Sequence, residues 1–199
     1  WPNFYGCPEQ IEDRINHFCS RNAMNIEGIR DKTITLLRTE LNVKTVADLY
    51  DLTQEDLLKL DKFKEKKSEN IISSIQKTKN PNFSNFIFAL GINGVGEKTA
   101  KDLAKKFKNL DELKNATVTD LTQINDIGEV IAQNIVNFFT DEKQLKLIND
   151  LFSKGVNITY SNVKTVENAN FSNKTIVLTG DLENFTRAEL TEKLEQFGA

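Results

Sequence analysis

One segment of the sequence has the residue types of a phosphate-binding turn, Gly94-Val95-Gly96-Glu97-Lys98-Thr99-Ala100. Glycine permits a positive φ and a close approach of another molecule to the backbone. A helix that begins directly after such a turn presents its first N–H groups outward, and these groups bind phosphate without reading base sequence. The segment therefore predicts a hairpin that binds a phosphate backbone.

The same pattern recurs along the chain. Behind the turn, Ala100, Leu103, Ala104 and Phe107 follow the i, i+3, i+4, i+7 spacing of an apolar helix face. The same apolar pattern follows three other turns, each with an apolar residue and then an acid. These turns lie 32 residues before the first segment, 32 residues after it, and a further 34 residues before the earlier one: Lys62-Phe63-Lys64-Glu65, Asp126-Ile127-Gly128-Glu129 and Gly28-Ile29-Arg30-Asp31. We predict four helix–hairpin–helix units. Ordinary helix corners capped by glycine are the alternative.

The four copies differ in how closely a phosphate can approach them. Only the third copy keeps both glycines, and the side chain of Asp126 in the fourth would repel phosphate. In the second copy, lysines could replace the amide contacts by charge. We rank the hairpins third, second, first and fourth as DNA contacts. The candidate DNA-binding residues are Gly94, Val95, Gly96, Lys98, Thr99, Lys62, Lys64, Lys66, Gly28, Arg30 and Gly128.

Helices must position these turns, and the pattern predicts a mostly α-helical fold. Few glycines and prolines, nine and three, are consistent with this fold. Thr53 with Asp56, and Thr117 with Asp120, have capping-box spacing. We expect the phenylalanines at 83, 86, 88, 107, 138, 139 and 152 to form core. The predicted helices span Glu9–Asn22, Lys32–Leu41, Thr45–Tyr50, Glu55–Leu60, Lys66–Thr78, Asn82–Leu90, Lys98–Phe107, Asp111–Asn115, Val118–Gln123, Val130–Phe139 and Glu142–Lys154.

Charged residues are distributed unevenly along the chain. The chain of 199 residues has a formal net charge of −3, which by itself argues against a general polyanion binder. Residues 59–110, however, carry +7 and contain the second and third hairpins, whereas the remainder carries −10. These basic blocks are either solvated helix faces or part of a nucleic-acid interface. No apolar stretch approaches the roughly 18 residues of a membrane span, so we expect no membrane partner.

Several motifs together resemble the C-terminal half of the bacterial-type NAD-dependent DNA ligases, almost from end to end. They are Cys7-Pro8-Glu9-Gln10, His17-Phe18-Cys19-Ser20-Arg21-Asn22-Ala23-Met24-Asn25-Ile26-Glu27-Gly28, Ala47-Asp48-Leu49-Tyr50-Asp51-Leu52 and Phe88-Ala89-Leu90-Gly91-Ile92, which leads into the third hairpin. The resemblance implies a compact domain of four hairpins that grips duplex DNA across the minor groove around a nick. It also implies NAD and magnesium as cofactors of the whole enzyme, and neither in this chain.

The resemblance also interprets the two ends of the chain. Cys7 matches the last of four zinc-ligating cysteines in a small finger, so residues 1–8 would be a remnant of that finger, or the site has been lost. Residues 9–156 would form the helix–hairpin–helix domain and residues 157–172 a linker. The predicted strand Thr175–Gly180 and a helix from Thr186 resemble the start of a BRCT domain, residues 173–199. The alternative is a small βα unit docked on the helices.

The sequence offers no catalytic centre. It lacks the Lys-x-Asp-Gly motif of adenylating enzymes and any glycine-rich nucleotide loop, and the sole histidine, His17, has no nearby nucleophile. We expect an intracellular, cytoplasmic and monomeric DNA-binding portion of a ligase that clamps nicked duplex while absent catalytic domains seal it. One alternative is a helix–hairpin–helix DNA glycosylase that uses Lys98 and Asp120; the other is a non-enzymatic hairpin scaffold.

Overall fold

The computed structural model describes residues 7–160, 176–177 and 187–196. Contacts divide the chain into two units, one up to Tyr160 and one from Ser161 onward. Each unit is described by itself. The first unit is built of helices, and its described β-structure is a single isolated bridge between Asn82 and Thr159.

The helices confirm the sequence prediction closely. Up to residue 154 each predicted helix is present, with its ends displaced by at most three residues, although the segment predicted at Thr45–Tyr50 is a 3-10 helix. Both predicted capping boxes form, at Thr53 and at Thr117. The elements are α1 (Pro8–Cys19), α2 (Asp31–Leu41), η1 (Val46–Asp51), α3 (Gln54–Leu58), α4 (Glu65–Lys77), α5 (Phe83–Ala89), α6 (Glu97–Lys106), α7 (Leu110–Lys114), α8 (Val118–Thr122), α9 (Glu129–Thr140), α10 (Glu142–Ser153) and α11 (Arg187–Gln196).

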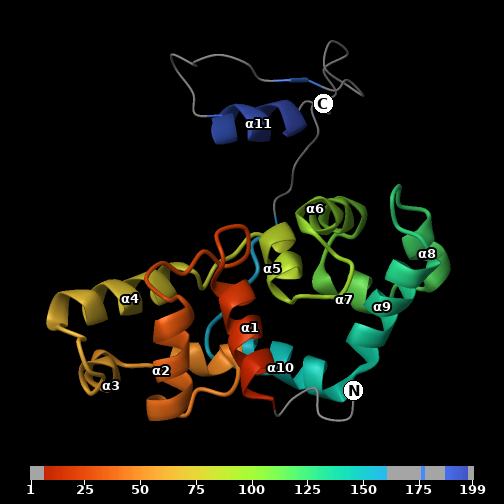
Figure 1. Cartoon of the computed structure of the whole chain (residues 1–199). Coiled ribbons are helices and arrows are strands. Elements are labelled where there is room, and N and C mark those ends of the chain that lie inside the picture. The colour runs from red at the N-terminus through yellow and green to blue at the C-terminus, as the bar shows by residue number, and fades with distance from the viewer. Residues whose placement is uncertain (1–6, 161–175, 178–186, 197–199) are drawn as a thin grey trace. The chain divides into compact units, whose positions relative to one another are not determined.

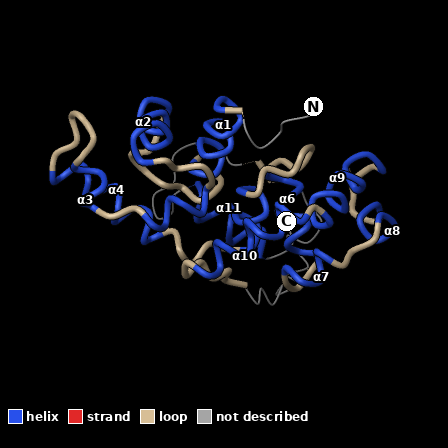
Figure 2. The backbone as a smooth tube through the Cα atoms, turned by 90° about the horizontal axis from the view of Figure 1, so that it is seen from below, coloured by secondary structure: helices blue, strands red, loops and turns tan. Residues whose placement is uncertain are grey.

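Four helix pairs organise the first unit. The helices that flank the four predicted turns pack against each other as α1 with α2, α3 with α4, α5 with α6, and α8 with α9. In Figures 1 and 2, α1–α4 lie on one side of the unit and α6–α9 on the other. Each turn is therefore the corner of a helix pair, as the repeat predicts.

The last long helix returns the chain to the first half of the unit. Helix α10 packs against both α9 and η1. At its C-terminal end, Lys154 forms ion pairs with Asp51 and Asp48 of η1. The ring of Phe152 stacks on Phe86 of α5 at a centroid distance of 5.8 Å. These contacts connect the two halves, so that the four hairpins belong to one packed unit.

The segment after α10 corrects the expected linker boundary. The sequence predicts a linker over residues 157–172, but Asn157–Tyr160 lie along Lys79–Asn82. The backbone N–H groups of Asn157 and Thr159 donate to the carbonyls of Lys79 and Pro81, each at 2.7 Å. The ring of Tyr160 also packs edge-on against Phe83. The Asn- and Thr-rich composition gave no sign of this packing, because the hydrogen bonds are made by backbone and not by side chains.

The core contains the predicted phenylalanines. Phe83, Phe86, Phe107 and Phe139 are buried, and the other three of the set pack against the core while partly buried. Burying rings of this size contributes about 1.5–3 kcal/mol each. Their role in the interior is confirmed.

The second unit is described only in part. The helix predicted after Thr186 is present as α11. Of the predicted buried strand Thr175–Gly180, only Ile176 and Val177 lie within the described residues; neither is in a strand, and Val177 is 78% exposed. The described residues therefore do not bear out a buried strand there, and the BRCT assignment stays a prediction.

Candidate nucleic-acid interface

The four predicted turns share one backbone conformation. At the first position of each turn φ is positive, between +65° and +86°, at Gly28, Lys62, Gly94 and Asp126. Side chains other than glycine tolerate this region at a cost of about 1–2 kcal/mol. Two of the four turns keep it without glycine, because the helices around each turn impose it. The repeat that the sequence suggested is thus a repeat of structure.

The residues after the left-handed position are also equivalent. An apolar side chain plugs each corner and is at most 7% exposed; these are Ile29, Phe63, Val95 and Ile127. Two positions later an acid begins the second helix, at Asp31, Glu65, Glu97 and Glu129. An acid in the first turn interacts favourably with the helix dipole. The sequence predicted both features.

None of the four helices that follow the turns has a side-chain N-cap hydrogen bond. Within residues 7–160, helices α3, α5, α7, α8 and α10 each have an N-cap side chain that accepts a hydrogen bond from the first-turn backbone. Helices α2, α4, α6 and α9 have no such side-chain cap, although each has an extended N-cap residue; α1, which begins at Pro8 and follows no hairpin turn, also lacks one. The first N–H groups of a helix need partners. At the hairpins these groups are left for solvent or for a ligand.

The N-cap residues divide the hairpins into two kinds. Gly96 and Gly128 begin α6 and α9, and a Cβ added at either would have nothing within 4 Å. The amides behind them are therefore open to close approach. At the equivalent positions Arg30 and Lys64 begin α2 and α4. These two hairpins place a cation where the other two place exposed backbone.

The hairpins pack in two pairs with different registers. A Cβ at Gly28 would meet Ile71 of α4 at 3.1 Å, and a Cβ at Gly94 would meet Ile131 of α9 at 3.1 Å. Counted from the N-cap of the partner helix, Ile71 is seven residues along and Ile131 three. The difference of four residues is about 6 Å at the helical rise. The first hairpin thus lies one helical turn further along its partner than the third does.

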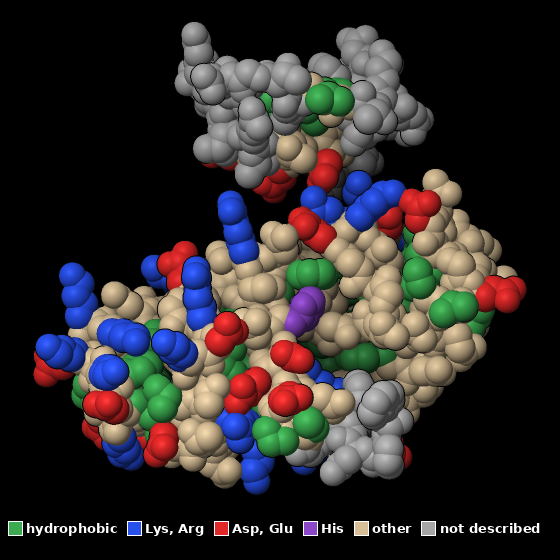
Figure 3. Space-filling view, in the orientation of Figure 1, with side chains coloured by type: hydrophobic (Ala, Val, Ile, Leu, Met, Phe, Trp, Pro, Cys, Tyr) green, Lys and Arg blue, Asp and Glu red, His purple; other side chains and the backbone are tan. Residues whose placement is uncertain are grey.

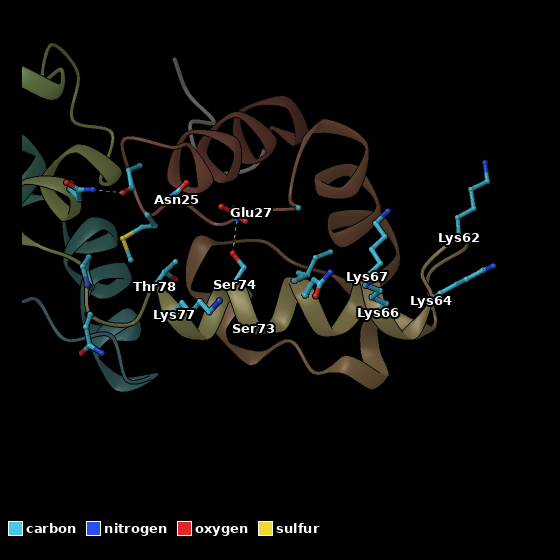
Figure 4. Close-up of a pocket in the computed structure, with 18 residues that line it drawn as sticks. Asn25, Glu27, Lys62, Lys64, Lys66, Lys67, Ser73, Ser74, Lys77 and Thr78 are labelled. Carbon is cyan, nitrogen blue, oxygen red and sulfur yellow. Dashed lines mark hydrogen bonds between the residues drawn. The ribbon is translucent and has the colours of Figure 1, made fainter. Parts of the chain in front are cut away.

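A basic groove lies between the first hairpin and α4. Its volume is about 1050 Å³, and its lining includes Lys62, Lys64, Lys66, Lys67 and Lys77, with Glu27 as the one acid in that lining. Figure 4 shows Lys62 and Lys64 extending from the second hairpin and the Ser74 hydroxyl accepting from the Glu27 backbone, at 2.8 Å. In Figure 3, Lys and Arg side chains gather over the α3–α4 side and again near α6.

The repeat also identifies a residue that the sequence analysis missed. Lys32, Lys66 and Lys98 occupy the same place, the second residue of α2, α4 and α6, and all three are exposed. Lys32 was absent from the candidate set, although aligning the four turns by their acids would have found it. In the fourth hairpin this place is taken by Val130, which is 76% exposed.

The predicted site residues Lys98 and Thr99 lie at the start of α6, where Thr99 is half-buried. Nζ of Lys98 is 2.5 Å from Oδ2 of Asp126 in the fourth turn, and this contact raises the pKa of Lys98. Asp120 is occupied elsewhere, because it accepts from the Thr117 backbone N–H at 2.9 Å and from its hydroxyl at 2.7 Å. These bonds hold the pKa of Asp120 below its usual range. Lys98 and Asp120 therefore have different partners, Asp126 and Thr117.

The histidine and the cysteines are not brought together. Nε2 of His17 donates to the carbonyl oxygen of Phe88 at 2.6 Å, which joins α1 to α5. Cys19 is buried, and burial raises the pKa of its thiol to about 12. Cys7 is half-buried at the N-cap of α1. Across the described ranges there is no cluster of three or more His, Cys, Asp or Glu side chains able to hold a metal.

No helix among the described residues is both long and apolar enough to cross a membrane.

Two sequence families match parts of the first unit. A helix–hairpin–helix motif family matches residues 85–148, and a family of SAM-like helix–hairpin–helix tandems matches residues 20–77. These matches and the four equivalent turns define the first unit as a tandem of helix–hairpin–helix motifs.

Several curated relatives are similar to this chain over nearly its whole length. A DNA ligase of Finegoldia magna is 49% identical over 198 residues, which is 100% of this chain and 30% of the relative. A DNA ligase of Clostridium tetani is 47% identical over 197 residues, 99% of this chain and 30% of the relative. DNA ligase 2 of Clostridium acetobutylicum is 46% identical, with 99% and 29% covered. This chain is homologous along its length to part of bacterial DNA ligases, which confirms the predicted resemblance.

The chain spans about 30% of the length of the curated relatives it matches. The family matches agree with the mostly α-helical fold predicted from the sequence.

Proposed function

We propose that this chain binds nicked duplex DNA through its phosphates and holds the two ends in line for a ligase reaction carried out by other parts of the protein. The observation that carries the proposal is the repeated hairpin: four equivalent turns lead into helices without side-chain caps, two through glycine and two through a cation. Helix N-termini and Lys or Arg side chains both bind phosphate and leave base sequence unread.

By aligning the two DNA ends at a nick, this chain would increase the rate of ligation as well as the affinity for DNA. Positioning two reacting groups can supply on the order of 7–11 kcal/mol of a barrier. The two hairpin pairs lie in different halves of one packed unit and are connected through α10. One rigid unit that holds duplex through both pairs would keep the 3′ and 5′ ends of a nick in register.

The remaining expectations follow from the resemblance to ligases and stay proposals. NAD and magnesium would act in the catalytic part of the whole protein. Zinc would belong to the finger before α1; Cys7 by itself, with no second metal ligand in a described cluster, does not fit a tetrahedral site. We further propose a monomeric, cytoplasmic protein in which residues 173–199 begin a BRCT-like domain.

Binding and complementation test the proposal together. The chain should bind a labelled nicked duplex with similar affinity across unrelated base sequences and should release no base from uracil-containing or oxidised duplex. When the missing part of a related ligase is supplied in trans, the chain should restore nick sealing. Binding without any restored sealing would leave a hairpin scaffold as the better description. Base release would favour a glycosylase.

A further inference from the structure

The third and fourth hairpins share one ion pair, although both side chains are exposed. Nζ of Lys98, at the start of α6, lies 2.5 Å from Oδ2 of Asp126, at the first position of the fourth turn. The two side chains are 76% and 63% exposed. Exposed pairs of this kind contribute little to folding, typically below about 1 kcal/mol. Fold stability therefore gives no sufficient reason for the pairing.

The backbone gives no reason for an aspartate at this position either. Asp126 has φ +66°, and the equivalent positions hold Gly28, Lys62 and Gly94. Glycine adopts this conformation without strain, and asparagine tolerates it as well as aspartate does. The turn needs a residue that accepts positive φ, but it does not need a carboxylate. What the carboxylate adds is a negative charge facing the third hairpin.

Lys98 is the cation that the third hairpin would offer to a phosphate. It is the second residue of α6, two residues after the open Gly96, and Lys32 and Lys66 occupy the same position in the first two hairpins. Asp102, on the same helix, also raises the pKa of Lys98, and the acids Glu97 and Glu129 begin the two helices at this junction. For Lys32 and Lys66 the structure shows no such acidic partner from another hairpin.

We propose that the Asp126 carboxylate is an internal competitor for DNA phosphate at the third hairpin. A phosphate that reaches Lys98 must exchange with Asp126, so the ion pair lowers the affinity of this hairpin for a duplex backbone. The inference rests on the proposed DNA-binding function and deepens it. It makes Asp126 a residue that tunes affinity, while the amides behind Gly96 and Gly128 carry the direct phosphate contact.

The substitution Asp126→Asn tests this with little effect on the fold, because asparagine keeps the positive φ and the size of the side chain. We expect the variant to bind nicked duplex up to about fivefold more tightly at low salt, the ratio that corresponds to an exposed ion pair. The salt dependence should steepen by up to about one unit of log slope, since Lys98 then neutralises a phosphate. Binding is measured by fluorescence anisotropy with the whole chain.

Two further proteins separate this effect from general electrostatics. Glu40→Gln removes one exposed acid at the end of α2 and makes the same change in net charge. In a Lys98→Gln background, Asp126→Asn should lose most of its effect. If Asp126→Asn equals Glu40→Gln, or acts equally well without Lys98, competition is wrong. If it weakens binding, Asp126 positions Lys98 instead, and the proposal is overturned. A wild-type chain that fails to bind nicked duplex would refute the proposed function itself.

Discussion

Gly96→Ser separates the binding role of a hairpin from its structural role. Gly96 has an ordinary extended conformation, φ −87° and ψ −172°, and an added Cβ would touch nothing within 4 Å. Serine is a preferred N-cap residue, so its hydroxyl should accept from a first-turn N–H of α6. We expect the free energy of unfolding to stay the same or to rise by a few tenths of a kcal/mol.

The same serine should impair DNA binding, because it occupies an amide that a phosphate would use and blocks close approach. Hydrogen bonds to a charged group contribute about 1.5–3 kcal/mol, which corresponds to a roughly 10- to 150-fold rise in Kd. Gly94 does not offer this separation. Its φ of +84° and the 3.1 Å approach to Ile131 make any side chain destabilising, so lost binding would be mixed with lost folding.

The assay is a pair of measurements on each protein: urea unfolding followed by circular dichroism, and anisotropy titration with nicked duplex. Asn109→Ser is the matched control, since it exchanges one N-cap for another on α7, away from the four turns. It should change neither quantity by much. If Gly96→Ser unfolds like the wild type and also binds with the wild-type Kd, the amides of α6 do not contact phosphate and the reasoning fails.

Three other variants test separate features. Lys64→Gln with Lys66→Gln should lower the slope of log K against log salt by about one unit for each lost phosphate contact; an unchanged slope would place the second hairpin away from DNA. Ser68→Ala should raise the free energy of unfolding by about 1 kcal/mol, because the buried Ser68 hydroxyl has no hydrogen-bond partner. The equivalent positions in the third and fourth hairpins hold the buried alanines Ala100 and Ala132. A lower free energy of unfolding in urea denaturation would refute this. Val130→Lys supplies the fourth hairpin with the lysine of the other three, and anisotropy should show tighter binding; no gain would mean that this helix start does not face the duplex.

The periodicity of the apolar residues was sufficient to predict the helices and the four turns. A stripe at i, i+3, i+4 and i+7 is a local property, because it depends on the 3.6-residue repeat of one helix. It located α6 and α9 within one residue at each end. The second turn shows the strength of that signal, since Lys62 keeps positive φ in a position where the sequence has no glycine.

The contacts between hairpins could not be predicted in the same way. The local sequence does not indicate that Gly28 packs against Ile71 or that Gly94 packs against Ile131. These two contacts nevertheless set the register of the two hairpin pairs. The ion pair between Lys98 and Asp126 joins residues 28 positions apart and exists only because the third and fourth turns pack side by side. The docking of Asn157–Tyr160 depends on backbone groups that every sequence carries.

The sequence by itself determined the repeating unit: where each helix starts, which side chain plugs each turn, and which hairpins carry charge. Only the tertiary structure decided which hairpins share an interface and which cation is already paired. The physical reason is that helix formation and capping depend on neighbours within about four residues, whereas register and ion pairing depend on how whole helices fill the space between them.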